Sequence, residues 1–277
     1  MAEETQIGPS IRAQLGKATP VIGRFEAMIL LGFVTGRTRE NLIAHDDDEL
    51  TDEEIMRFDL LVSLRAAGTP VPYLTGTQEF YGRHFQVTDR VLIPRPDTEV
   101  LIEQALLVAP AAPRIIDLGT GSGCIAVTLA LEIPGAKVTA TDSSSDALEI
   151  ARGNADVLGA DIRFLEGFWW DAVPADEQFD LIVSNPPYIR PDDEHLRNLE
   201  YEPLGALTDG IDGLECLRVI SAGAMARLSR GGWLLLEHGY DQGADVRAML
   251  EDAGFAAVRT IRDYGGNDRV TMGRRAD

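Results

Sequence analysis

Cysteine and histidine are scarce in this sequence. Among 277 residues there are two cysteines, Cys124 and Cys216, and four histidines, none of which stands at metal-ligand spacing from another. A disulfide framework needs more cysteines than this, and a structural zinc site needs a Cys/His cluster. We therefore expect two buried thiols and no metal site.

The sequence also has no apolar run that is long enough to cross a bilayer. The longest run, FEAMILLGFV at residues 25–34, falls well short of the ~20 residues that a membrane-spanning helix needs. The N-terminus, MAEETQIGPS, is acidic and polar and lacks the basic and apolar regions of a secretory signal. We expect a cytoplasmic protein that makes no contact with a membrane.

Basic side chains are also scarce relative to acidic ones. Lys and Arg number 25 against 45 for Asp and Glu, so the formal net charge is -20 and the isoelectric point is near 4.5. Such a surface repels nucleic acid at long range and attracts a basic protein partner. The composition therefore argues against a general DNA or RNA binder.

The first part of the chain has a helical pattern. From Ile11 to Ala67 apolar residues recur at intervals of three and four. Between two such segments, Thr51 followed three residues later by Glu54 forms a capping-box pattern. The prolines that follow end this pattern. These features predict a small helical domain at residues 1–75.

The rest of the chain changes from a hairpin pattern to an alternation of strands and helices. Residues 76–95 contain two short β-type segments, which predict a hairpin linker. From Pro113 onward apolar strand patterns alternate with helical ones. This alternation predicts an α/β domain at residues 96–277, with a mostly parallel sheet, helices on both faces and ligands at the carboxyl ends of the strands.

A glycine-rich loop, DLGTGSG, follows the first strand of this domain and precedes a helix. Glycine lets the backbone turn sharply and lets a ligand approach closely. Cys124 stands where a dinucleotide fingerprint has its last glycine, so a nucleoside ligand is favoured over a pyrophosphate. The alternative is a tight turn without a ligand. The candidate binding residues are Gly119, Thr120, Gly121, Ser122 and Gly123.

The next strand ends at Asp142. In nucleoside-binding α/β folds an acidic residue at about this distance beyond the glycines accepts hydrogen bonds from ribose hydroxyls. The alternative is a solvated aspartate at a strand end. Beside the glycine loop, we interpret Asp142 as a ribose ligand.

The stretch VSNPPYIRP follows a later apolar strand and places Asn185, Pro186, Pro187 and Tyr188 at the same edge of the sheet. The two prolines fix φ and donate no amide hydrogen, so rigid carbonyl oxygens are left as acceptors, and the tyrosine adds an aromatic face. This arrangement is suited to hold a planar NH2 group. The alternative is a Pro-Pro turn that only closes the strand.

Together these motifs resemble the class I methyltransferases that use S-adenosylmethionine. NPPY is similar to the signature of enzymes that methylate amide or exocyclic amino nitrogens, which include adenine-specific DNA methyltransferases and protein-glutamine methyltransferases. Five further segments resemble, in the same order, segments of the release factor glutamine methyltransferases (the HemK/PrmC family): YLTGTQEFYG, LIPRPDTEVLIEQAL, EPLGALTDG, LLLEHGYDQG and RDYGGNDRVTMGR.

The resemblance implies a Rossmann-like domain preceded by a small helical domain that recognises the substrate and is joined by a β-hairpin. It implies methyl transfer from S-adenosylmethionine, leaving S-adenosylhomocysteine, to the glutamine of the Gly-Gly-Gln motif in peptide chain release factors. Residues 119–123 would hold the methionine part of the cofactor, Asp142 the ribose, and Asn185 to Tyr188 the substrate glutamine, with Asn185 also facing the cofactor.

The motifs do not determine the adenine contact or the general base. The family often has an acidic residue near the adenine where this sequence has Phe168, Trp169 and Trp170, so the adenine contact falls on these aromatic residues without a choice between the tryptophans. No general base is obvious, although Glu237 and His238 end a strand.

The rival function, methylation of adenine amino groups in nucleic acid, requires a basic groove or a recognition insert, and the sequence has no visible candidate for either.

Overall fold

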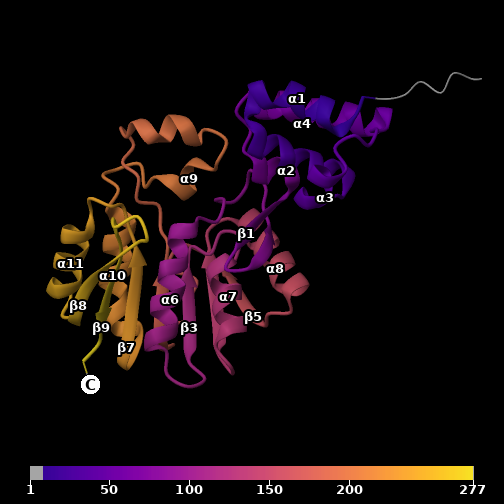
Figure 1. Ribbon diagram of the computed structural model, residues 1–277. Coiled ribbons are helices and arrows are strands. Elements are labelled where there is room, and N and C mark those ends of the chain that lie inside the picture. The colour runs from indigo at the N-terminus through magenta and orange to yellow at the C-terminus, as the bar shows by residue number, and fades with distance from the viewer. Residues whose placement is uncertain (1–8, 277) are drawn as a thin grey trace, which may run out of the picture. The chain divides into compact units, whose positions relative to one another are not determined.

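The computed structural model describes residues 9–276, and within it the chain divides into two compact units. The first unit ends at Gly76 and the second begins at Thr77. Figure 1 shows that the first is helical and that the second is built around a sheet. No helix in the described range is long and apolar enough to cross a membrane.

The first unit is a small bundle with its own core. Its helices are α1 (Ile11–Ile22), α2 (Arg24–Thr35), α3 (Arg39–Ala44), α4 (Asp52–Ala66) and α5 (Val71–Thr75). The core contains Ile11, Leu30, Leu31 and Phe58, none of which is exposed. The helical pattern of the sequence thus corresponds to one buried face on each of several helices.

Two local predictions in this unit have different outcomes. The capping box at the start of α4 is confirmed: the Thr51 hydroxyl accepts from the Glu54 amide at 3.2 Å, and the Glu54 carboxylate accepts from the Thr51 amide at 2.8 Å. The prediction that the prolines end the helical pattern is wrong for Pro72, which lies inside α5. A proline is tolerated there because the amides of a first helical turn have no partner within the helix.

The predicted β-hairpin is present, but it belongs to the second unit, whereas the sequence predicted a linker between two domains. Strands β1 (Thr77–Phe80) and β2 (Arg83–Gln86) pair antiparallel. Both residues of the connecting turn, Tyr81 and Gly82, have positive φ, as a two-residue hairpin turn of type I′ requires. Phe80 and Phe85 pack edge to face with ring centroids 6.1 Å apart, so the hairpin joins the main core of this unit.

The second unit contains a seven-stranded sheet in the order β5-β4-β3-β6-β7-β9-β8. All neighbouring pairs are parallel except those of β9, which runs antiparallel to both neighbours. The predicted mostly parallel sheet is confirmed. Its strands are β3 (Arg114–Leu118), β4 (Lys137–Asp142), β5 (Ile162–Glu166), β6 (Phe179–Ser184), β7 (Leu228–Glu237), β8 (Ala256–Arg262) and β9 (Asp268–Arg274).

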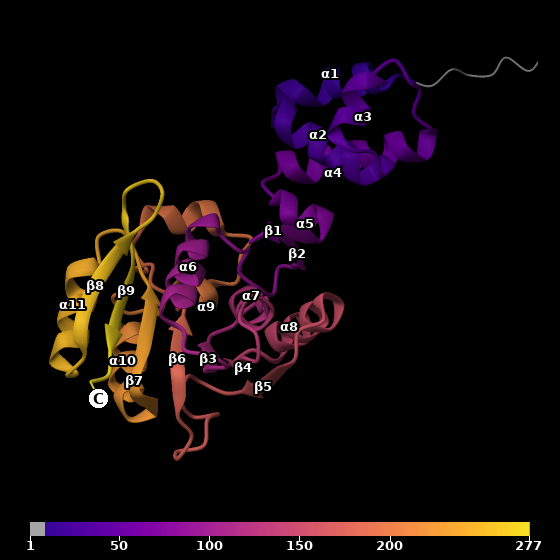
Figure 2. The same ribbon diagram turned by 60° about the horizontal axis from the view of Figure 1, so that its bottom comes forward.

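Helices cover both faces of this sheet (Figures 1 and 2). Ile115 packs in a core with α6 (Glu99–Val108) and α7 (Cys124–Glu132), whereas its neighbour Ile116 packs in another with α10 (Glu215–Arg227) and α11 (Gly243–Asp252). Successive strand side chains point to opposite faces, so these strands are apolar on both sides. Helix α8 (Ser145–Leu158) lies on the α7 side, and two shorter helices, η2 (Glu194–Leu199) and α9 (Leu204–Leu207), follow β6.

The order of the strands determines where a ligand can bind. From β3 the chain moves outward through β4 to β5, and it then returns to β6 on the other side of β3. Such a reversal leaves a crevice at the carboxyl ends of the two central strands. The glycine loop follows β3 and the NPPY stretch follows β6, so both motifs border this crevice.

Candidate active site

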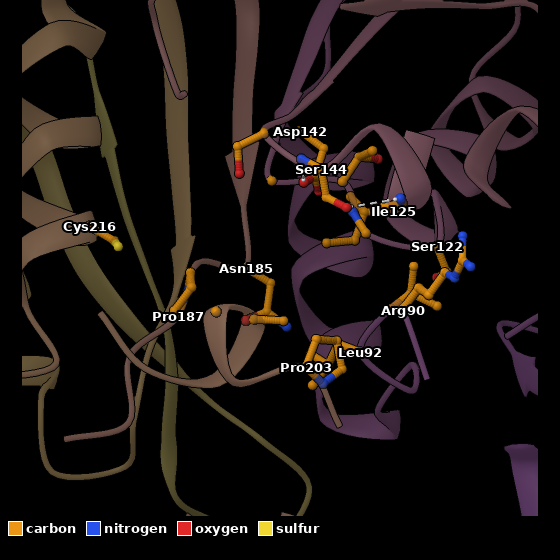
Figure 3. Close-up of a pocket in the computed structure, with 18 of the residues that line it drawn as sticks. Arg90, Leu92, Ser122, Ile125, Asp142, Ser144, Asn185, Pro187, Pro203 and Cys216 are labelled. Atoms are coloured by element: carbon orange, nitrogen blue, oxygen red, sulfur yellow. Dashed lines mark hydrogen bonds between the residues drawn. The ribbon is translucent and has the colours of Figure 1, made fainter. Parts of the chain in front are cut away.

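A cavity of about 440 Å³ lies at this edge of the sheet (Figure 3). Its walls come from the loops after β3, β4, β5 and β6 and from two further segments, residues 90–98 and 203–216. Of the predicted site residues, the structure brings nine to the cavity wall: Gly119, Thr120, Gly121, Ser122, Asp142, Phe168, Trp169, Asn185 and Pro187. The other four, Gly123, Trp170, Pro186 and Tyr188, do not line it.

The glycines of the loop have different structural roles. Gly119, Gly121 and Gly123 all have positive φ, which side chains rarely adopt. A Cβ on Gly123 would lie 3.1 Å from the Cβ of Ala151, so this glycine allows α7 and α8 to pack closely. A Cβ on Gly121 would meet nothing within 4 Å, because its backbone faces the cavity. Gly121 is therefore the point at which a ligand can approach the main chain.

Asp142 connects the glycine loop to the end of β4. One carboxylate oxygen accepts from the Gly121 amide and the other from the Ser144 amide, each at 2.9 Å. Burial raises the pKa of Asp142, and these hydrogen bonds from backbone amides oppose the rise. A carboxylate has about four lone-pair sites, so the backbone amides leave it some acceptor capacity for hydroxyl donors in the cavity.

The structure separates the three aromatic residues after β5. Phe168 is exposed at the mouth of the cavity, and the ring of Trp169 lies against Gly119, where a Cβ would come within 3.1 Å of it. Trp170 does not line the cavity, and its indole N–H donates to the Ile220 carbonyl of α10 at 3.3 Å. The positive φ of Trp169 turns the chain between the two rings. The geometry favours Trp169 over Trp170 for a contact with a bound base.

The side chains of the NPPY stretch also point in different directions. Asn185 faces the cavity, and its Nδ2 donates to the hydroxyl of Thr98 at 3.2 Å. Pro186 is buried, and the hydroxyl of Tyr188 points away from the cavity to donate to Glu237 at 3.3 Å. Just before the motif, the Ser184 hydroxyl donates to the Leu118 carbonyl at 2.6 Å, which holds the ends of β6 and β3 together.

Sequence reasoning missed two walls of the cavity, residues 90–98 and 203–216. They are joined through buried Glu202, which forms an ion pair with Arg95 and accepts from the Ile93 amide at 3.0 Å. Asp209 then folds the second segment, because its carboxylate accepts from three backbone amides between residues 211 and 215. Both walls overlap segments that resemble the family, LIPRPDTEVLIEQAL and EPLGALTDG, for which the sequence alone predicts no role.

The two polar residues at the end of β7 have different surroundings. Glu237 is buried at the end of the strand, and burial raises its pKa to about 7. Burial lowers the pKa of His238, whose ring nitrogens contact the Gly239 carbonyl and the Thr271 hydroxyl, each at 2.8 Å. Neither residue lines the cavity. Residues 9–276 contain no group of three or more His, Cys, Asp or Glu side chains that could hold a metal ion.

Comparisons with known proteins agree with this geometry. Residues 10–76 match the family model of the PrmC N-terminal domain, and residues 96–200 match that of the methyltransferase small domain. A methyltransferase from Pyrococcus furiosus shares the fold with a TM-score of 0.56 at 19% identity, over 72% of this chain and 91% of that one.

Two curated relatives cover most of the chain. The release factor glutamine methyltransferase of Neisseria gonorrhoeae is 50% identical over 91% of this chain and 93% of its own length. The release factor glutamine methyltransferase of Escherichia coli is 45% identical over 91% and 92%, respectively. With matches of this extent at both of its units, the chain belongs to the release factor glutamine methyltransferase family.

Proposed function

We propose that the cavity binds S-adenosylmethionine and a glutamine side chain together, and that the enzyme methylates the amide nitrogen of that glutamine. The acceptor is the glutamine of the Gly-Gly-Gln motif in a peptide chain release factor, and the product is N5-methylglutamine. The observation that carries the proposal is the presence of the glycine loop and Asn185 in one cavity at the reversal of strand order. The names of the relatives support the choice of substrate.

The residues present fit the cofactor. Gly121 offers open main chain to the methionine part, and Asp142 keeps free lone pairs for ribose hydroxyls. Trp169 presents a ring beside the glycine loop, where it would contact the adenine. When bound, S-adenosylmethionine supplies a methyl group on a sulfonium, which is an excellent leaving group.

The task of the protein is to orient the acceptor amide. An amide nitrogen is a poor nucleophile because its lone pair is delocalised. Asn185 uses its Nδ2 to donate to Thr98, and no residue of the described chain donates to its Oδ1. That oxygen can therefore accept a hydrogen of the glutamine NH2, and the Pro186 carbonyl would accept the other. These contacts favour the pyramidal nitrogen needed for attack, and alignment with the methyl group supplies further rate.

The helical unit would recognise the release factor. On α2, the apolar side chains of Phe25, Ile29 and Phe33 are 65%, 38% and 46% exposed. Residues four apart lie on one face of a helix, so these three form an apolar stripe that the core of the unit does not use. The cavity is lined only by residues from 90 onward, which separates cofactor binding from this stripe in the sequence.

The function is tested by incubating the enzyme with a purified release factor and methyl-labelled S-adenosylmethionine. Mass spectrometry of the digested factor should place one methyl group on the glutamine of Gly-Gly-Gln. A factor with asparagine at that position and an adenine-containing oligonucleotide serve as controls and should gain no label. Label on the oligonucleotide instead of the factor would overturn the proposal in favour of adenine methylation.

Asn185→Ala gives a second test of the same proposal. We expect turnover to fall by ~10²–10³, the range for removal of one preorganised polar contact at a reacting centre. Binding of S-adenosylhomocysteine should change little, because the contact acts on the acceptor. Single-turnover rates with saturating cofactor measure the effect. A rate near that of the wild type would mean that the NPPY stretch only closes the strand.

A further inference from the structure

A polar cluster extends from the cavity wall, at Thr98 and Asn185, to buried Glu237, which does not line the cavity. It consists of Thr98, Asn185, Tyr188, Glu237 and Arg269, which come from η1 (Pro96–Thr98), the segment after β6, and the strands β7 and β9. Thr98 is 2% exposed and Glu237 is 1% exposed. Burying a carboxyl group is costly, and an apolar side chain would often be as stable there. The role proposed above for the cavity does not explain Glu237.

Thr98 stands between Glu237 and the amide that faces the cavity. Asn185 donates from Nδ2 to the Thr98 oxygen at 3.2 Å, so the Thr98 hydroxyl must direct its own hydrogen elsewhere. The Glu237 carboxylate is the acceptor beside it, and the Thr98 hydroxyl lowers its pKa. Oε2 of Glu237 is buried and has no hydrogen-bond partner in the described chain, so it is open to the Thr98 hydrogen.

The direction of these contacts matters because a carboxamide has two different ends. With Nδ2 toward Thr98, Oδ1 is left to accept a hydrogen from a substrate NH2. If the group turned over, two NH2 groups would face each other, and both can only donate. An ionised Glu237 prevents this, because it takes the Thr98 hydrogen and leaves the Thr98 oxygen as an acceptor for Nδ2.

We infer that Thr98 and Glu237 are positioning residues that fix the rotation of the Asn185 carboxamide, so that its oxygen faces the glutamine to be methylated. The inference rests on the proposed function for its catalytic consequence. Its structural content, the orientation of Asn185, is independent of which substrate the cavity takes.

The charge of Glu237 should control the orientation of the Asn185 carboxamide. Burial raises its pKa to about 7, while Thr98, Arg269 on β9 and Tyr188 lower it, and Asp97 on η1 raises it. Cys124 on α7 also lies within range of its charge. A protonated Glu237 donates to Thr98, and Thr98 can then donate to Oδ1 of Asn185 and turn the carboxamide over. Orientation, and with it turnover, should therefore be lost as the pH falls through about 7.

The first experiment follows the Asn185 side-chain NH2 resonances by NMR in the full-length protein, assigned with the help of Asn185→Ala. In the wild type they should move with pH around a midpoint near 7. Glu237→Gln should abolish the movement, and Tyr188→Phe should shift its midpoint upward, because the Tyr188 hydroxyl stabilises the ionised form. Resonances that move in the same way in Glu237→Gln would overturn the inference, whether or not the enzyme acts on release factors.

The second experiment measures kcat and KM for a release factor in Thr98→Val, Thr98→Ser and Glu237→Gln. Thr98→Val should lower kcat by about tenfold, which corresponds to the loss of one hydrogen bond, with KM nearly unchanged. Thr98→Ser keeps the hydroxyl and should restore most of the rate, and Glu237→Gln should flatten the pH profile near 7. Equal losses in the valine and serine variants would overturn the inference, because a packing role alone predicts them. A wild-type enzyme inactive on release factors would instead refute the proposed function.

Discussion

Asp142 offers the sharpest test of the cofactor site, because it contacts both the glycine loop and the end of β4. Asp142→Ala removes the acceptors of the Gly121 and Ser144 amides, which lie 2.9 Å from its two oxygens. Asp142→Asn keeps one acceptor oxygen but turns an NH2 group toward the other amide. Cofactor affinity should therefore fall in the order wild type, asparagine, alanine.

The magnitude follows from the contacts that are lost. A hydrogen bond to a charged group contributes ~1.5–3 kcal/mol, and removing one partner also leaves the other unsatisfied. We expect the alanine variant to lose ~1–3 kcal/mol of binding free energy. This corresponds to a rise in Kd of roughly 5- to 150-fold.

Calorimetric titration with S-adenosylhomocysteine measures this change, and thermal unfolding measured in parallel shows whether the fold is kept. Glu166→Ala is a matched control, because Glu166 pairs with Asp142 in the sheet register but is exposed and does not line the cavity. Its Kd should equal that of the wild type. If the alanine variant at Asp142 binds with unchanged affinity, Asp142 is only a clamp on the loop and the ribose assignment is refuted.

Three further predictions address other parts of the molecule. Gly121→Ala adds the strain of positive φ without a clash, so it should weaken cofactor binding and lower the melting temperature only moderately. Gly123→Ala adds the same strain and a Cβ against α8, so it should lower the melting temperature more; equal effects on both properties would contradict the different roles of the two glycines. Phe25→Ser with Phe33→Ser should raise KM for the release factor and leave the Kd of the cofactor unchanged, and an unchanged KM would remove the stripe from substrate recognition. Burial raises the pKa of Asp117 from 3.8 to about 7, so the folded state binds more protons than the unfolded state between these values, and the free energy of unfolding falls as pH rises through this window. Asp117→Asn should reduce that slope, by up to about 1.4 kcal/mol per pH unit, and denaturant unfolding at several pH values would show whether it does.

Much of the fold could be predicted because its determinants are local. A capping box involves residues three apart, and the alternation of strand and helix patterns indicates a parallel sheet with covered faces. The glycine loop and Asn185 could be placed at one edge because the carboxyl ends of parallel strands lie at the same edge. These inferences did not require knowledge of which strands are neighbours.

The remaining features depend on contacts that the sequence does not encode locally. The positive φ of Trp169 determines which tryptophan reaches the cavity. No residue type in this stretch predicts such a turn. The wall built on Glu202 and Arg95 joins positions 107 apart. The link from Asn185 to Thr98 spans 87 positions and is equally invisible to periodicity.

The position of β9 has a consequence for how the enzyme is made. β9 follows β8 in the chain, yet it lies between β7 and β8 and pairs with both. During synthesis, domains tend to fold from the N-terminus as they emerge, and the helical unit has its own core from which to do so. The sheet cannot form in the same order, because β8 is joined to β7 only through β9. Strand β9, which contains Arg269, is synthesised after β8. A ribosome that stalls before β9 would thus carry a nascent chain with the glycine loop already synthesised but with β7 still an open edge.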